Sequence, residues 1–174
     1  MNTLSQEELA RIILQYGEDK SAARIARGIC QAREQAPIET TFQLAEIIKP
    51  PSPPRCGGGR AIRPARPSSL RIAVNGELDR LQEGLQAGFG LLKPGGRLAV
   101  ITFHSLEDRI VKRQMNEWCQ GCICPKDFPV CVCGRKPQGK LVYKKGLAPG
   151  EQELQDNPRA RSARLRVIEK LGQS

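Results

Sequence analysis

Four polar residues, His104, Ser105, Glu107 and Asp108, follow a run of apolar residues, and His104 is the only histidine in the chain. A histidine beside a hydroxyl can activate a nucleophile, but no Gly-x-Ser-x-Gly turn surrounds Ser105, and sequence neighbours rarely form a catalytic triad. Ser105 and Asp108 have the spacing of a helix cap, and acids are favoured in a first helical turn. Helix capping and a place in a functional site both remain open for these residues.

Five of the seven cysteines lie close together, between residues 119 and 133. Their spacing, C-x2-C-x-C-x6-C-x-C, can close a tetrahedral zinc site, although it differs from the two separated C-x2-C pairs of common zinc ribbons. Reduced thiols in a surface loop are the simpler interpretation, and a disulfide framework is not expected. The candidate metal ligands are Cys119, Cys122, Cys124, Cys131 and Cys133.

The segment NPRARSARLRV carries a dense group of arginines. Guanidinium groups at this density suit phosphate contacts, which position a nucleic acid without reading its sequence. The same residues alternate with apolar ones as in a strand, and an outward arginine on a strand can still meet RNA. The predicted RNA-binding residues are Arg109, Arg159, Arg161, Arg164 and Arg166.

A helix, a turn and a strand must position His104. We expect Asn75 to cap a helix that ends at the turn Lys-Pro-Gly-Gly, residues 93–96. The apolar run RLAVITF, residues 97–103, is typical of a strand buried on both faces of a parallel sheet. Helix, turn, strand and new helix form the unit of a doubly wound α/β fold, whose ligands bind at the carboxyl ends of the strands. His104 lies at such an end.

The composition divides the chain into three parts. Residues 1–48 show three short amphipathic helical patterns, too small to bury much apolar surface alone. Residues 49–70 are rich in proline, glycine and arginine, which predicts a linker or an irregular loop. Residues 71–174 carry the α/β pattern and the cysteine-rich loop 119–133.

The overall charge favours a polyanionic partner. Among 174 residues, 28 are Lys or Arg and 18 are Asp or Glu, which gives a formal net charge of +10. The sequence contains neither a long apolar span nor an apolar signal-type segment at its start, so we expect no membrane association and a cytoplasmic location.

The stretch GGRLAVITFHSLEDRIVKR closely resembles the hallmark of the bacterial 16S ribosomal RNA methyltransferase H family. These S-adenosylmethionine-dependent enzymes methylate N4 of a cytosine. Other blocks resemble the family's helical insertion, its return into the sheet, its cysteine-rich segment and its C-terminal signature. In chain order they are LSQEELARIILQYGEDKSAARIARGI, TTFQLAEII, LRIAVNGELDRL, CICPKDFPVCVCGRKP and NPRARSARLRVIEK.

The resemblance implies an α/β fold, the C-terminal part of a class I, Rossmann-like methyltransferase sheet. It further implies that residues 1–48 form an all-helical insertion that resembles a substrate-recognition domain. It also implies a truncated form, because the family's glycine-rich loop of the type GGHS, its acidic strand end and its DLGVSS segment are not found in this sequence. We therefore expect no cofactor-binding residues, no S-adenosylmethionine binding and no activity from this chain alone. In the complete enzyme, His104, Ser105, Glu107 and Asp108 would wall the site behind the cofactor.

One segment departs from the family pattern. The family reads close to HPATRTFQALRIAVN where this chain reads IRPARPSSLRIAVN, and a shifted reading frame and ordinary divergence both explain it. The implied partner is 16S ribosomal RNA or the small ribosomal subunit. A non-catalytic basic module for RNA binding or ribosome assembly is the alternative function, and a non-functional remnant is a third possibility.

Overall fold

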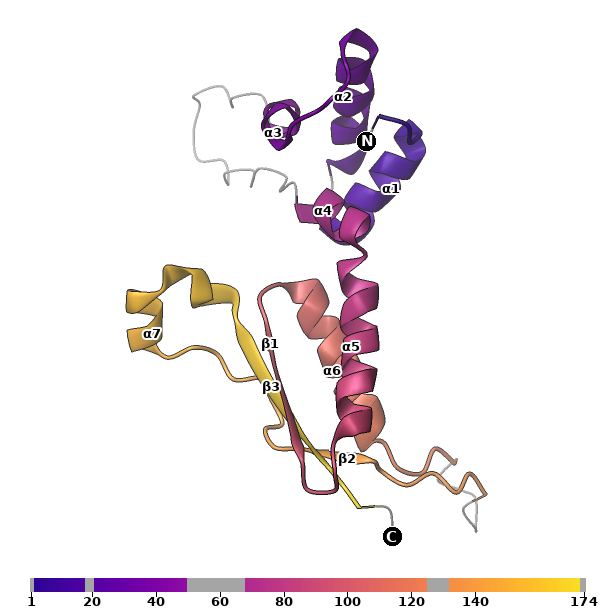
Figure 1. Cartoon of the computed structure of the whole chain (residues 1–174), viewed down its shortest axis with the longest axis vertical. Coiled ribbons are helices and arrows are strands. Elements are labelled where there is room, and N and C mark those ends of the chain that lie inside the picture. The colour runs from indigo at the N-terminus through magenta and orange to yellow at the C-terminus, as the bar shows by residue number, and fades with distance from the viewer. Residues whose placement is uncertain (1, 18–20, 50–67, 125–131, 173–174) are drawn as a thin grey trace. The chain divides into compact units, whose positions relative to one another are not determined.

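The computed structural model describes residues 2–17, 21–49, 68–124 and 132–172 (Figure 1). The chain separates into two compact units, residues 1–77 and 78–174, and residues 50–67 of the predicted linker lie outside the described residues. Over the described ranges, no helix combines the length and the apolar character that a membrane span requires.

The first unit is helical and contains α1 (Gln6–Gly17), α2 (Ala22–Gln35), α3 (Thr41–Ile48) and α4 (Ser68–Asn75). Helix α1 packs against α2 and α4, and α2 packs against α3. A capping box begins α1, since the Ser5 backbone N–H donates to Glu8 over 2.8 Å and the Glu8 N–H donates to Ser5 Oγ over 3.2 Å. The buried core consists of Leu9, Ile13, Ala22, Ile25, Ala26, Ile29, Leu44, Ile48 and Leu70.

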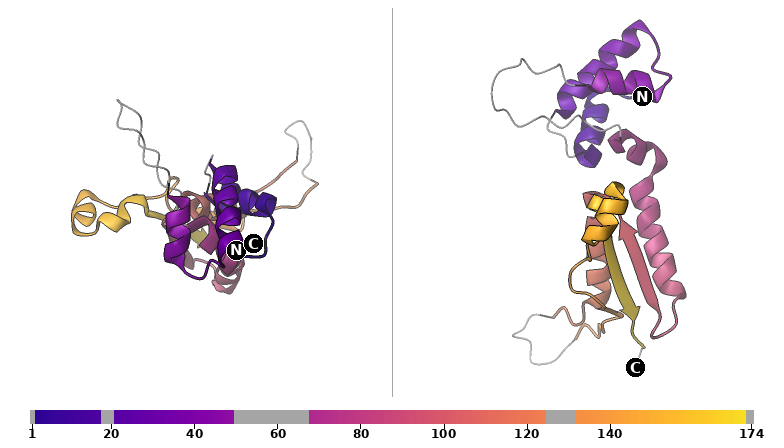
Figure 2. Two further views of the ribbon diagram at one scale, coloured as in Figure 1. Left: turned by 90° about the horizontal axis from the view of Figure 1, so that it is seen from above. Right: turned by 90° about the vertical axis from the view of Figure 1, so that its left-hand side faces the viewer.

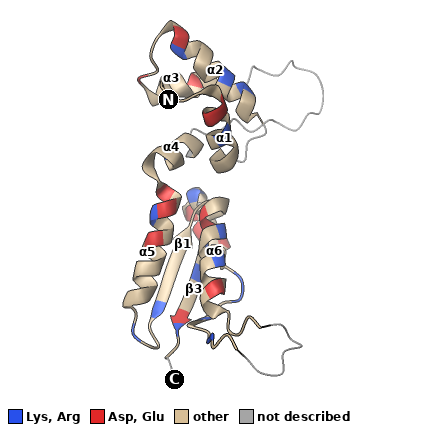
Figure 3. Cartoon of the chain, turned by 90° about the vertical axis from the view of Figure 1, so that its right-hand side faces the viewer, with Lys and Arg blue, Asp and Glu red and all other residues tan. Residues whose placement is uncertain are grey.

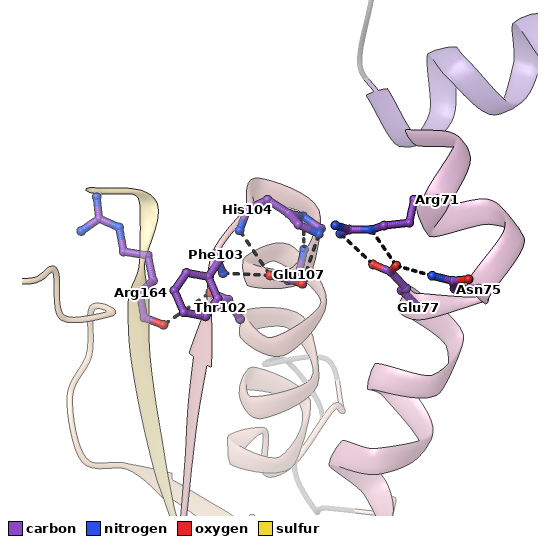
Figure 4. Close-up of polar contacts among 8 residues, drawn as sticks. All are labelled: Arg71, Asn75, Glu77, Thr102, Phe103, His104, Glu107 and Arg164. Carbon is purple, nitrogen blue, oxygen red and sulfur yellow. Dashed lines mark hydrogen bonds and ion pairs between the residues drawn. The ribbon is translucent and has the colours of Figure 1, made fainter. Parts of the chain in front are cut away.

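Helix α4 begins inside the segment that composition indicates as a linker. This helix forms because Leu70 and Ile72 are buried and give it an apolar face. The prolines and glycines nearby make the helical pattern hard to recognise in the sequence. Asn75 was expected to cap the next helix, but it is the last residue of α4, and Gly76, at a φ of 59°, separates it from α5 (Glu77–Leu91). Glu77 instead accepts hydrogen bonds from Arg71, over 2.9 and 3.1 Å, and from Asn75 (Figure 4).

The second unit is α/β. After α5 come β1 (Arg97–Thr102), α6 (Ser105–Cys119), β2 (Gly139–Leu141), α7 (Glu151–Asp156), the 3-10 helix η1 (Pro158–Ser162) and β3 (Arg164–Lys170). The strand order is β1-β3-β2, and the central strand β3 runs antiparallel to both neighbours.

The core of the second unit joins α5 and α6 to one face of this sheet (Figure 2). The rings of Phe89 and Trp118 stack with their centroids 4.0 Å apart and their planes at 8°. Ile168 of β3 is fully buried in the same cluster. Lys170 Nζ donates to the carbonyls of Phe89 and Gly90 over 3.0 and 2.9 Å, which satisfies acceptors that the end of α5 leaves open.

The expectation that residues 97–103 are buried on both faces of a parallel sheet is wrong in the described structure. Strand β1 pairs antiparallel with β3, and its side chains alternate between covered and exposed. Ile101 and Phe103 are 60% and 58% exposed, because the helices cover only the opposite face. Within the described ranges β3 is the sole strand partner of β1, so the outer edge of β1 is open.

The turn between α5 and β1 generates a test of this unit. The Gly96 N–H donates to the Lys93 carbonyl over 2.9 Å, and Gly95 has a φ of 80°. Gly95→Ala should therefore lower the free energy of unfolding by about 1–2 kcal/mol. Gly84→Ala is the matched control, because its added Cβ meets open space within α5 and should raise stability by about 0.5–1 kcal/mol.

Urea unfolding followed by the emission of Trp118, the only tryptophan, measures both variants. Equal effects of the two substitutions would contradict the described turn.

Candidate functional site

A capping box centred on His104 follows the carboxyl end of β1 and begins α6. The Glu107 backbone N–H donates to His104 Nδ1 over 3.3 Å, and Glu107 Oε2 accepts from the backbone N–H groups of Phe103 and His104 over 2.8 and 3.2 Å (Figure 4). The prediction that Ser105 caps the helix with Asp108 is wrong by one residue. His104 takes the cap position because its extended backbone, φ −139° and ψ 163°, continues from the strand, and Ser105 is the first helical residue.

The cap fixes the orientation of the imidazole. Because Nδ1 accepts a hydrogen bond, a neutral His104 carries its proton on Nε2. Nε2 is shielded from solvent and lies 3.2 Å from Glu107 Oε1, yet among the described residues no acceptor meets it with hydrogen-bond geometry. A shielded donor of this kind is uncommon in folded proteins and more frequent at functional sites. His104 therefore combines a structural role in the helix cap with a shielded nitrogen, Nε2, whose nearest partner is the carboxylate of Glu107.

Asp108 and Arg166 form an ion pair between α6 and β3. Arg166 Nε and Nη2 donate to the two carboxylate oxygens over 2.7 and 2.9 Å, and the two side chains are only 24% and 13% exposed. The hydrogen bonds from Arg166 hold the pKa of Asp108 below its ordinary value, opposed by partial burial and helped by the charges of Arg166, Arg164 and Lys112. Both residues, singled out from sequence as site candidates, thus join two elements of the fold.

The other predicted RNA-binding residues are exposed. Arg159 and Arg161 lie in η1, Arg164 begins β3, and Arg109 lies in the second turn of α6. Since β3 is antiparallel to β1 and Arg164 pairs with Thr102, the start of β3 lies beside the end of β1. Figure 3 shows that α6 mixes basic and acidic positions. The charged residues of η1 are both arginines. The arginines of η1 therefore approach the same end of the sheet as His104.

Phe103 is a site candidate that the sequence reasoning missed. It was counted in a buried strand, but it lies just beyond β1 and is 58% exposed. The alternation of Leu98, Val100 and Thr102 on the covered face was the signal that could have identified the exposed face. An exposed aromatic ring close to arginines suits the stacking of an unpaired base.

Three of the five predicted metal ligands come together. The Sγ atoms of Cys122, Cys124 and Cys133 all lie within 4.8 Å of one another. Cys119 ends α6 and packs against the core, and burial raises the pKa of its thiol, partly offset by a hydrogen bond with the backbone of Leu141. Cys131 lies outside the described residues.

The two acids that follow His104, Glu107 and Asp108, are a poor match to the binding of an adenosine cofactor. Such a cofactor needs a carboxylate for its ribose hydroxyls and a glycine loop for close backbone approach. The nearby carboxylates are engaged in the fold, Glu107 with the helix cap and Asp108 with Arg166.

The ion pair generates a pH-dependent test. The pKa of Asp108 is lower in the folded chain than in the unfolded chain. The contribution of Asp108 to stability is therefore complete above the unfolded pKa, near 3.9, and is lost as the pH falls through the folded pKa. Asp108→Asn should cost about 1–3 kcal/mol at pH 7 and should lose less stability on acidification below about pH 4 than the wild type.

Urea titrations monitored by Trp118 emission at several pH values measure this difference, with Asp79→Asn on the exposed side of α5 as control. Parallel pH profiles of the wild type and Asp108→Asn would contradict the pairing.

Comparison with known proteins identifies the family. The sequence model of the MraW methylase family matches residues 1–171. Proteins named ribosomal RNA small subunit methyltransferase H are 52% identical in Citrifermentans bemidjiense, 52% in Symbiobacterium thermophilum and 55% in Acetivibrio thermocellus. Each match covers 98% of this chain but only 54–55% of the relative, so the chain spans about half the length of the curated relatives it matches. The chain belongs to the MraW methylase family, and its fold is of the predicted α/β, class I methyltransferase type.

Proposed function

We propose that this chain is the substrate-side part of an enzyme that transfers a methyl group from S-adenosylmethionine to N4 of a cytosine in 16S ribosomal RNA. The observation that carries the proposal is the family match over residues 1–171. The relatives are named for ribosomal RNA of the small subunit, and the block around His104 resembles that of enzymes that act on cytosine N4. Residues 1–48 then correspond to the helical insertion of the family.

The arrangement at the carboxyl end of β1 supports a role in holding RNA. Phe103, the shielded His104 Nε2 and the arginines of η1 all lie at this end of the sheet, where α/β proteins bind their ligands. Arginines can hold phosphates and an exposed ring can stack on a base, which together position a single-stranded nucleotide.

The chemistry requires positioning more than activation. The exocyclic amine of cytosine is a nearly neutral nucleophile, so it needs orientation toward the methyl group, stacking of its ring and acceptance of a proton. In our proposal His104 and Glu107 form a rigid wall of the site, with Ser105 and Asp108 alongside as parts of the same helix start. No direct catalytic step is assigned to any of these four residues.

We further propose that residues 1–174 alone are a truncated, inactive form that does not hold the cofactor. The proposal is supported by the engaged carboxylates of Glu107 and Asp108 and by the open edge and exposed apolar face of β1. Further strands would pair with such an edge, and helices packed on the sheet would cover such a face.

A non-catalytic RNA-binding or assembly module is the second candidate function. It is favoured by the exposed arginines Arg159, Arg161 and Arg164, which are available for phosphates whether or not a cofactor binds. The two candidates share the RNA contact and differ in the need for a methyl donor.

Equilibrium dialysis with labelled S-adenosylmethionine tests the absence of a cofactor site. We expect that binding to the purified chain does not saturate up to about 1 mM S-adenosylmethionine. This limit corresponds to a binding free energy weaker than about 4 kcal/mol. The relative from Acetivibrio thermocellus is dialysed in parallel for comparison, and saturation of that protein would show that the assay detects binding. Saturable binding of the chain at micromolar concentration would contradict the proposed truncation.

The RNA contact is tested by the salt dependence of binding to transcribed 16S ribosomal RNA. Replacing Arg159 and Arg161 together with alanine should lower the slope of log K against log salt by about 1.4 in magnitude, because each lost single-strand phosphate contact removes about 0.7.

The matched control replaces Lys93 and Lys140, two exposed lysines at the opposite end of the sheet, and removes the same charge. If the two double variants have equal slopes, the change in net charge alone explains the effect, and a specific contact of Arg159 and Arg161 with RNA is contradicted. No measurable affinity of the wild type for RNA would favour a non-functional remnant.

A further inference from the structure

The loop between α6 and β2 has two limbs that run side by side at its base. The Gln138 N–H donates to the Trp118 carbonyl over 2.8 Å, and Arg135 Nη2 donates to the Glu117 carbonyl over 3.1 Å. A Cβ at Gly121 would lie 3.4 Å from Pro137 Cδ, so the limbs also touch between these contacts. The base of the loop is therefore held to the end of α6.

The three clustered cysteines lie just beyond this base, on both limbs. Cys122 and Cys124 are on the outgoing limb, and Cys133 is on the returning limb, directly before Gly134 at a φ of 59°. Ile123 and Val132 alternate with the cysteines and are 55% and 74% exposed. The apolar side chains of these described parts thus face solvent while the thiols face one another, so hydrophobic burial does not hold the limbs together here.

The distances suit a shared metal ion better than a disulfide. Two sulfurs bound at about 2.3 Å to one tetrahedral zinc ion lie about 3.8 Å apart. Cys122 Sγ and Cys133 Sγ are 3.6 Å apart, whereas a disulfide bond is about 2.05 Å long. The third thiol, Cys124, lies within 4.8 Å of both, and a disulfide between the other two would leave it without a role.

We propose that Cys122, Cys124 and Cys133 bind one zinc ion, which joins the two limbs of the loop between α6 and β2. Three thiolates and a soft, redox-inactive divalent ion form a favourable ligand set, and the fourth position is open to water or another donor. The ion is structural, because it ties the end of α6 to the segment that leads into β2. Binding replaces three thiol protons by the metal, so about three protons leave for each ion bound at a pH below the thiol pKa.

The test uses the full chain, kept reduced and dialysed without chelator against zinc. Elemental analysis should find about one zinc ion per chain, and the variant with Cys122→Ser and Cys133→Ser should retain almost none. Cys119→Ser and Cys30→Ser are matched controls, since neither belongs to the cluster, and both should keep the metal. Cobalt in place of zinc should give a thiolate-to-metal charge-transfer band in the wild type that is lost in the double variant.

Two further measurements keep the outcome clear if a variant folds poorly. Trp118 emission reports whether the second unit is folded in each sample, and hydrogen exchange of the wild type should show zinc-dependent protection in residues 121–124 and 132–138. Failure of the folded, reduced wild type to take up zinc would overturn the proposal, as would equal zinc content in the double variant and the controls. A Cys122–Cys133 disulfide in protein that takes up no zinc after reduction would also overturn it.

Discussion

The antiparallel pairing of β1 with β3 is the constraint on which the second unit depends. It joins residues 97–102 to residues 164–169 and brings Arg164 beside Thr102, at the end of the strand that precedes His104. The same pairing places Ile168 against the stack of Phe89 and Trp118 and brings Lys170 to the end of α5. Helices, sheet and candidate site are thus positioned by one set of backbone hydrogen bonds between distant segments.

Local patterns predicted most of the elements of this fold. Helical periodicity located the first three helices, and Lys-Pro-Gly-Gly marked the turn before β1, where glycine is needed at a positive φ. Two features of the fold were not predicted, for a reason of context. Helix α4 depends on burial of Leu70 in the core of the first unit, and the exposed face of β1 depends on which layers cover the sheet. Neither fact is contained in the composition of the segment itself.

The candidate site shows a similar division. The polar cluster after β1 was correctly recognised as the start of a helix, but the choice of His104 over Ser105 as the cap follows from where the strand ends. The pairing of Asp108 with Arg166 unites residues far apart in sequence and could not be predicted from spacing. Among the cysteines, spacing identified the cluster, and the described part of the loop brings Cys122, Cys124 and Cys133 together.

The central position of β3 has a consequence for the order in which this unit can form during synthesis. Thr102, the last residue of β1, leaves the ribosome well before Arg164, its partner in the sheet. At about 5–20 residues per second, β1 waits on the order of 3–12 s without that partner. During this interval the edge of β1 that pairs with β3 is open, and an unpaired apolar strand edge can pair with other chains. The unit therefore folds late, once its central strand has been made.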